Sequence, residues 1–257
     1  MSVLEVVHAS ISFGGVRANS DITMQIGEWE IVGIIGPNGA GKTTAFNIIT
    51  GFYEPDSGVV RFKGQDVTEL GVHERTALGM GRTFQNVGMV KGVTVRDNLK
   101  SAQHLRAEYA TISGMLGHPR SFRAEDDLDD RAERLVELLE LEHLLDEQVA
   151  GLPYGDLKRV ELATVLATDP DVLLLDEPTS GMGPEESEEL GDTLLKLRKD
   201  FGLSIAMIEH HVPMVVRICD YVYCLAFGQM LAEGKPDAVR NDPEVIRAYL
   251  GDEALHG

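Results

Sequence analysis

The chain has 257 residues, of which 43% are hydrophobic, and its 23 basic residues stand against 42 acidic ones, a formal net charge of −19. This acidic excess argues against a sequence-independent grip on nucleic acid and against adsorption to anionic lipid, because both require clustered Lys and Arg. The N-terminus lacks a signal-peptide pattern, and no apolar run reaches the ~20 residues of a membrane span. We therefore expect a cytoplasmic protein that reaches a membrane only through partners.

Hydrophobic patterning predicts strands that alternate with helices. Residues 2–8 and 20–26 alternate apolar and polar side chains, as paired strands do. Uninterrupted apolar strands, typical of a sheet covered on both faces, are expected at 30–36, 171–178 and 203–211. The remaining predicted elements are a strand at 59–63, a helix over 123–148, a hairpin over 221–236 that turns at Phe227-Gly228, and a final helix over 237–250.

This order of elements predicts an α/β fold with a mostly parallel sheet. An antiparallel β-subdomain is expected at its N-terminus. We expect residues 1–86 and 157–257 to form the catalytic core and residues 87–156 to form an inserted α-helical subdomain. Cys219 and Cys224 share one apolar stretch, so we expect reduced core thiols rather than a disulfide, a metal site or a nucleophile.

The strongest motif is GPNGAGKT, which follows the apolar strand at 30–36 and precedes a helical pattern. It matches the phosphate-binding loop GxxxxGK[ST] in its proper strand–turn–helix context. Glycines let backbone N–H groups converge on phosphate oxygens, and the helix N-terminus adds its dipole. Lys42 is expected at the β- and γ-phosphates of ATP, and the Thr43 hydroxyl at Mg²⁺. The predicted ATP-binding residues of this loop are Gly36, Pro37, Asn38, Gly39, Ala40, Gly41, Lys42, Thr43 and Thr44.

The loop makes a P-loop NTPase (RecA-like) core the expected fold, and a second acidic element supports it. In VLLLDEP an apolar strand delivers Asp176 and Glu177 at its carboxyl end. Downstream of a phosphate-binding loop, this arrangement predicts that Asp176 associates with Mg²⁺ and that Glu177 polarises the attacking water. The alternative for Glu177 is a structural role, in which its carboxylate only caps the next helix.

Together these motifs resemble those of the ATP-binding-cassette (ABC) ATPases, and the resemblance covers nearly the whole chain. It implies that Gln85, in GRTFQNV, links Mg²⁺ and the attacking water to the helical subdomain. His210, after SIAMIE, would contact the γ-phosphate, with the neighbouring His211 as the alternative. Phe13, in SISFGGVRA, would stack on adenine. The alternatives are a surface glutamine at position 85 and a plain core residue at position 13.

The stretch LPYGDLKRVELA matches the family's signature motif, usually Leu-Ser-Gly-Gly-Gln, which closes over ATP held by the opposite subunit. The signature residues are Leu152, Pro153, Tyr154, Gly155 and Asp156. Leu152 and Gly155 agree with the family, whereas Pro153 removes a hydroxyl and a backbone N–H. Asp156 places a carboxylate where an amide is usual, and it could cap the following helix. Outside the signature, in the D-loop stretch SGMGP, Gly183 stands where the family usually has an Asp or Asn. We expect these departures to weaken the closed dimer without abolishing it.

Several stretches, among them GRTFQN, IEHHVPMVV and DPEVIRAYLGDEA, resemble the ATPase subunits of branched-chain amino-acid importers. In that subfamily the signature commonly reads LxYG, as it does here. The resemblance implies ATP and Mg²⁺ as ligands, a second ABC ATPase subunit in a heterodimer or homodimer, and two transmembrane permease subunits. It also implies an indirect link to a substrate-binding protein and a place at the cytoplasmic face of the membrane. Urea, amides and aromatic acids are the alternative substrates.

Two other functions fit some of the residues. A cassette ATPase that acts on nucleic acid or ribosomes would usually carry two cassettes, coiled-coil inserts or basic extensions, and the sequence shows none of these. A weakly hydrolysing regulatory cassette is suggested by the altered signature and by Gly183. The full set of catalytic residue types argues against it.

Overall fold

The computed structural model describes residues 2–83, 89–90, 92–115 and 125–256. The chain forms two compact units, of which the first comprises Met1–Val72 with Leu174–Gly257 and the second comprises His73–Leu173. The helical insert expected at 87–156 lies inside the second unit, which extends beyond it on both sides.

The strands form two sheets, and their pairing gives the fold its class. The strands are β1 Ser2–Phe13, β2 Val16–Gly27, β3 Ile31–Ile35, β4 Ser57–Phe62, β5 Gln65–Asp66, β6 Met80–Arg82, β7 Val172–Asp176, β8 Ser204–Ile208, β9 Tyr221–Ala226 and β10 Gln229–Gly234. The smaller sheet has the order β2-β1-β4-β5, and the larger sheet has the order β10-β9-β3-β8-β7-β6. β3 pairs in parallel with both β8 and β9, whereas β10 pairs with β9 in the antiparallel sense. The predicted α/β class with an antiparallel N-terminal sheet is confirmed.

Two of the predicted helices, at 123–148 and 237–250, are shorter or more interrupted than the sequence pattern predicts. The helices that the structure describes are α1 Lys42–Ile49, α2 Val72–Leu78, α3 Val95–Met115, α4 Glu125–Leu138, α5 Tyr154–Leu166, α6 Pro184–Phe201, α7 Val212–Ile218, α8 Pro236–Arg240 and α9 Pro243–His256, with 3₁₀ turns at Glu142–Leu144 and Val149–Gly151. The helix expected to run to residue 148 ends at Leu138, because Glu140 adopts a left-handed φ of 55° that a helix cannot contain. The single helix expected over 237–250 is two helices, because Pro243 starts a new one.

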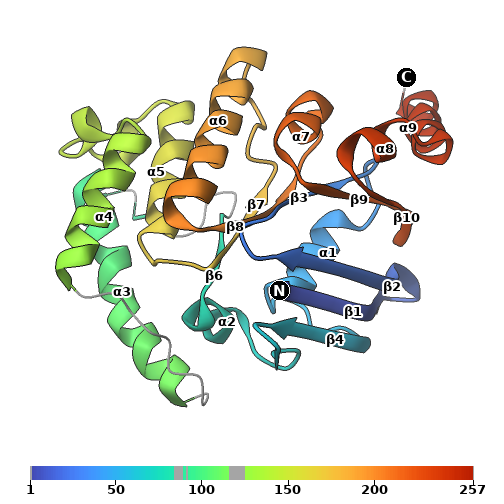
Figure 1. Ribbon diagram of the computed structural model, residues 1–257, viewed down its shortest axis with the longest axis horizontal. Coiled ribbons are helices and arrows are strands. Elements are labelled where there is room, and N and C mark those ends of the chain that lie inside the picture. The colour runs from blue at the N-terminus through green and yellow to red at the C-terminus, as the bar shows by residue number, and fades with distance from the viewer. Residues whose placement is uncertain (1, 84–88, 91, 116–124, 257) are drawn as a thin grey trace. The chain divides into compact units, whose positions relative to one another are not determined.

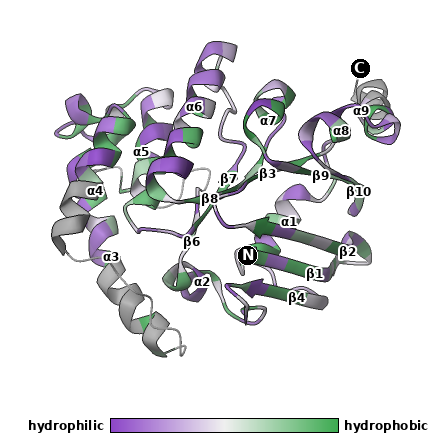
Figure 2. Ribbon diagram, in the orientation of Figure 1, coloured by the Kyte–Doolittle hydropathy of each residue, from purple (hydrophilic) through white to green (hydrophobic). Residues whose placement is uncertain are grey.

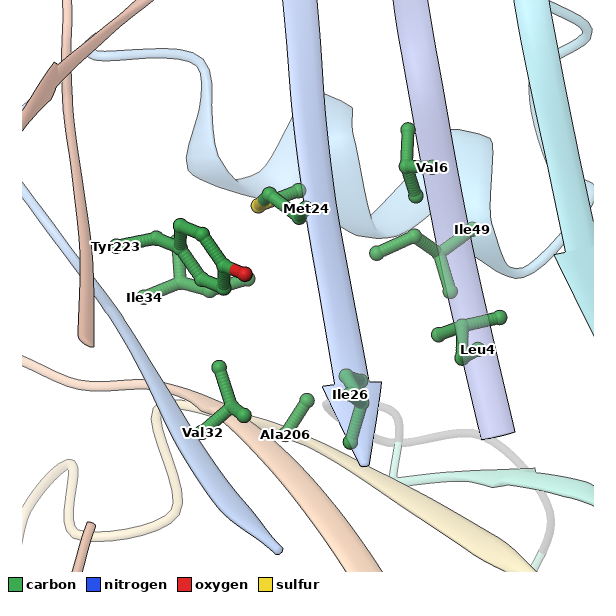
Figure 3. Close-up of a pocket in the computed structure, with 9 residues that line it drawn as sticks. All are labelled: Leu4, Val6, Met24, Ile26, Val32, Ile34, Ile49, Ala206 and Tyr223. Carbon is green, nitrogen blue, oxygen red and sulfur yellow. The ribbon is translucent and has the colours of Figure 1, made fainter. Parts of the chain in front are cut away.

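The antiparallel sheet and the parallel sheet of the first unit share one apolar core. Along β1 and β2, buried residues largely alternate with exposed ones, and Val6 pairs with Met24. Figure 1 shows β1, β2 and β4 side by side. A small pocket of about 10 Å³ remains between the sheets, and Figure 3 shows Tyr223, Ile34 and Val32 across from Met24 and Ile26 around it. So small an apolar space offers no room for a ligand.

Amphipathic helices and tight turns complete the first unit. The ribbon of α6 is mostly purple in Figure 2, the colour of hydrophilic residues, whereas its Leu194 and Leu197 are fully buried. The hairpin between β9 and β10 turns at Phe227 and Gly228, with φ values of 50° and 73°, as the two-residue turn of a twisted hairpin requires. The predicted hairpin and its turn are confirmed.

Both cysteines are buried free thiols, as the sequence predicts. Burial raises the pKa of the Cys224 thiol to about 11 and raises the pKa of the Cys219 thiol still further. Because the thiolate is the reactive form, neither side chain is poised for nucleophilic chemistry at neutral pH. Among the helices that the structure describes, none combines the length and the apolar character needed to cross a bilayer.

Candidate functional site

The glycine-rich loop leaves the carboxyl end of β3 and runs directly into α1. Gly41 is the N-cap of α1 and adopts a left-handed φ of 95°, and Gly39 adopts a φ of 73°. A Cβ atom at Gly41 would lie 2.6 Å from the carbonyl oxygen of Ala18, so only glycine fits there. At the surface of this loop, Asn38 and Thr43 are exposed. The loop therefore presents backbone and hydroxyl groups outward at the N-terminus of a helix.

Lys42 is the charged group at the centre of this loop. Its side chain is almost fully buried, and its ammonium donates hydrogen bonds to the carbonyl oxygens of Gly36 at 2.7 Å and Pro37 at 2.9 Å. A buried charge needs such partners to offset its desolvation. The ammonium is thus folded over the loop that it belongs to, in the position from which it can meet an anion seated on the same loop.

Three contacts from distant segments hold the loop in place, and the sequence pattern identifies none of them. The buried Asn19 amide donates to the Gly41 carbonyl oxygen at 3.2 Å. The Gly36 N–H donates to the Tyr249 hydroxyl of α9 at 2.8 Å. The Gly228 N–H, in the β9–β10 turn, donates to the Ala40 carbonyl oxygen at 3.0 Å. A lone Asn or Tyr in a strand or helix carries no motif, so only the tertiary structure identifies these residues.

A second cluster lies at the carboxyl ends of β7 and β8. Asp176 is the last residue of β7, and Glu177 follows it with a left-handed φ of 49°. The Glu177 N–H donates to the carbonyl oxygen of Ile208 at 3.0 Å, which fixes the start of this loop to the end of β8. The Glu177 carboxylate lies 3.0 Å from Nε2 of His210, and both side chains are partly open to solvent.

The structure separates the two candidate histidines. His210 contacts Glu177, whereas His211 is the N-cap residue of α7 and its Nδ1 is buried. A Glu177 carboxylate that only capped the next helix would have to reach α6, but its hydrogen-bond partner is His210. Phe13 is 43% exposed at the end of β1 and contacts the ring of Tyr53 edge-on at 5.0 Å between centroids, so it is not a plain core residue.

The signature stretch belongs to the second unit and opens α5. Pro153 is the N-cap residue, in extended conformation, and Leu152 precedes it at the end of a 3₁₀ turn. Tyr154 is half exposed. Gly155 is helical, and a Cβ atom at that position would meet nothing within 4 Å. The Asp156 carboxylate pairs with Arg159 one turn further on at 2.5 Å and takes no cap position at the helix start.

The donor set fits a nucleotide-bound cation better than a protein-held metal. Among the residues that the structure describes, no group of three or more His, Cys, Asp or Glu side chains could hold a metal ion. A magnesium ion needs few protein ligands, because substrate phosphates and water complete its shell. The predicted ligands Thr43 and Asp176 both lie in the first unit. Gln85, the third predicted ligand, lies outside the described residues.

Comparison with known proteins identifies the family. Residues 19–180 match the family model described as ABC transporter, and residues 229–254 match that described as branched-chain amino acid ATP-binding cassette transporter. The chain is 39% identical to the high-affinity branched-chain amino acid transport ATP-binding protein LivG of Salmonella typhimurium, over 97% of this chain and 98% of LivG. It is 36% identical to the corresponding protein BraF of Pseudomonas aeruginosa, over 97% and 98% of the two chains.

A solved structure agrees with this assignment. The fold superposes on the ADP conformation of MJ1267, an ATP-binding cassette of an ABC transporter, with a TM-score of 0.83 and 30% identity over 98% of this chain and 99% of that one. Sequence and fold together show that this chain belongs to the ABC transporter family, as an ATP-binding subunit.

Proposed function

We propose that the chain is the ATP-hydrolysing subunit of an importer for branched-chain amino acids. The observation that carries hydrolysis is the 3.0 Å contact between Glu177 and His210, in the same compact unit as the loop that holds Lys42. The substrate class is supported by the names of LivG and BraF, which match nearly the full chain.

Different residues of the first unit bind the nucleotide and promote its hydrolysis. Phe13 stacks on adenine, and backbone N–H groups near the end of the loop, around Lys42 and Thr43, bind phosphate oxygens. Lys42 exchanges its loop carbonyls for phosphate oxygens and so neutralises charge that develops on them. Glu177 polarises the attacking water, and His210 contacts the γ-phosphate. Thr43 and Asp176 would hold magnesium, which would neutralise charge at the phosphates.

The signature residues act on a nucleotide held by another subunit. A glycine that meets nothing within 4 Å is not required by packing within its own chain, so the space beside Gly155 is available to a partner's nucleotide. The Asp156 carboxylate is engaged by Arg159, which reduces its repulsion of phosphate. We infer a dimer with a second ABC ATPase, most simply a heterodimer, because Pro153 and Asp156 supply no side-chain donor to the opposite site.

Replacing Gly155 with Ala separates folding from catalysis. The substitution should leave the chain equally stable or stabilise it by up to about 1 kcal/mol, because Ala is the better helix former. In the assembled complex, the added methyl group would crowd the nucleotide of the opposite subunit, and we expect turnover to fall. Urea unfolding of the chain and steady-state ATP hydrolysis by the complex measure the two effects.

Gly151 provides the matched control for this prediction. A Cβ atom at Gly151 also meets nothing within 4 Å, and it lies just ahead of the signature. Gly151→Ala should therefore change neither stability nor turnover appreciably. Equal turnover in the Gly155→Ala and Gly151→Ala complexes would contradict a signature role for α5.

The complex that fits these residues is an importer assembled at the membrane. Two transmembrane permease subunits receive the movement of the ATPase dimer, and a substrate-binding protein delivers the solute to them. The chain then lies at the cytoplasmic face of the membrane. Uptake of labelled leucine, isoleucine and valine by a deletion strain tests the substrate. The strain should lose this uptake, the wild-type chain should restore it, and Lys42→Ala should not. Loss of urea, amide or aromatic-acid uptake instead would reassign the substrate.

A further inference from the structure

Glu209 is a buried acid that the proposed mechanism does not use. It lies between the end of β8 and the start of α7, directly ahead of His210, and only 2% of the residue is exposed. A carboxylate is seldom buried without partners, because its desolvation is costly. Its partners therefore indicate what it is for.

Four donors converge on this one carboxylate. Oε1 accepts the N–H of Thr179 at 2.9 Å and the hydroxyl of Thr179 at 2.7 Å. Oε2 accepts the N–H of His210 at 2.8 Å and the N–H of His211 at 3.0 Å. One oxygen thus binds the loop that follows Glu177, and the other binds the segment that carries the two histidines.

Only a carboxylate satisfies this arrangement. All four groups donate, so both oxygens must accept, and hydrogen bonds to an ionised acceptor are roughly twice as strong as neutral ones. A glutamine in the same place has one oxygen and one NH₂ group. Its NH₂ would face either the N–H groups of His210 and His211 or the N–H and hydroxyl of Thr179, so in each orientation at least one backbone N–H would lose its acceptor.

The contacts of Glu209 connect the parts of the hydrolytic site. The Glu209 N–H also donates to the carbonyl oxygen of Ile34 at 3.3 Å, in the strand that leads into the phosphate-binding loop. On the histidine side, fixing the His210 backbone sets the direction from which its ring reaches Glu177. On the other side, fixing Thr179 sets the turn that begins at Glu177, whose carbonyl accepts the Ser180 N–H at 3.0 Å.

We propose that Glu209 is a positioning residue for ATP hydrolysis, which holds Glu177 and His210 in the relative placement that turnover needs. This inference rests on the proposed hydrolytic function. Among the described residues, the hydrogen bonds of Glu209 go to Thr179, the two histidines and Ile34 rather than to the phosphate-binding loop, so we expect it to act on the rate of the chemical step rather than on the affinity for nucleotide.

Glu209→Gln tests this proposal in the membrane complex, purified through a tag on this chain. We expect kcat for ATP hydrolysis to fall by about 10- to 100-fold, the loss typical of a misplaced catalytic group. The KM for ATP and the affinity for MgADP, measured by calorimetry, should change less than about twofold, because the phosphate-binding loop is untouched. A support of the fold alone would lower turnover and nucleotide affinity together.

Comparison with His210→Ala makes the test sharper. Because Glu209 acts partly through His210, adding Glu209→Gln to a His210→Ala complex should lower kcat by no more than about threefold further. The matched control is Glu30→Gln, which removes the same charge from a carboxylate that accepts the Gly27 N–H at 2.6 Å, away from the histidines. This control should keep wild-type kcat.

The outcomes separate the two proposals. Wild-type turnover in Glu209→Gln, equal losses of kcat and nucleotide affinity, or fully multiplicative losses with His210→Ala would each overturn the positioning role. Turnover that survives Glu177→Gln overturns the proposed function instead. Should the Glu209→Gln complex fail to assemble, Thr179→Val removes only one of the four hydrogen bonds. It should then lower kcat by about two- to fivefold with KM unchanged, as loss of one such bond implies, and an unchanged kcat would count against the proposal.

Discussion

Glu177→Gln is expected to lower ATP turnover of the assembled complex by about 100- to 10,000-fold, the contribution of a positioned general base. Glutamine has nearly the same shape, so its oxygen can keep the 3.0 Å contact with His210, but it cannot take up a proton from water. Nucleotide binding should persist because the phosphate-binding loop is unchanged. Phosphate release and MgADP calorimetry measure the two quantities.

The control for this variant is Glu189→Gln, which removes the same charge from an exposed position of α6. It should leave turnover at the wild-type rate. A second comparison places the Glu-to-Gln change in the partner ATPase. We expect the site that uses Glu177 of this chain to be the hydrolytic one. If the change in this chain spares most turnover while the change in the partner abolishes it, the competent site is instead the one that faces Pro153 and Asp156, and the proposal that this chain hydrolyses ATP is wrong.

Gly41→Ala is expected to abolish nucleotide binding and to destabilise the chain by about 2–5 kcal/mol. The left-handed backbone costs an alanine about 1–2 kcal/mol. Steric overlap with the Ala18 carbonyl and the Asn19 amide, each 2.6 Å from the added carbon, costs about 1–3 kcal/mol more. Urea unfolding measures the stability, and MgADP calorimetry measures binding.

Gly64→Ala is the matched control for the backbone term. Gly64 has a φ of 80° in the turn between β4 and β5, and a Cβ atom there meets nothing within 4 Å. It should lose only the left-handed penalty and should bind nucleotide normally. If both variants were equally stable and both bound MgADP, the close approach at Gly41 would play no part in shaping the loop.

Local chemistry explains which parts of the structure the sequence predicts. The loop at Lys42 and the acids at Asp176 and Glu177 are predictable because each motif joins a strand to specific residue types at fixed spacing. The end of α4 near Glu140 is not predictable, because the leucine stripe continues while the backbone turns left-handed. Helix periodicity predicts which face of a helix is apolar, but it does not predict the residue at which the backbone leaves the helical conformation.

The sequence does not predict residues that support the site, such as Glu209, for a different reason. Glu209 follows an apolar strand and precedes two histidines, a pattern that draws attention to the histidines rather than to the acid. The role of Glu209 depends on Thr179, which lies thirty residues earlier in the chain and meets Glu209 only in the tertiary fold. An acid directly after a wholly buried strand is the one signal from which the sequence could have suggested a buried carboxylate.

The Tyr249 hydroxyl joins the last helix of the chain to the first residue of the phosphate-binding loop. Proteolytic removal of the C-terminal residues would therefore affect the phosphate-binding loop. Cleavage ahead of Tyr249 would remove the acceptor of the Gly36 N–H and so loosen the loop, although every residue that we propose to bind nucleotide would remain in the chain. An intact α9 is thus a condition for comparing nucleotide affinities between preparations of this protein.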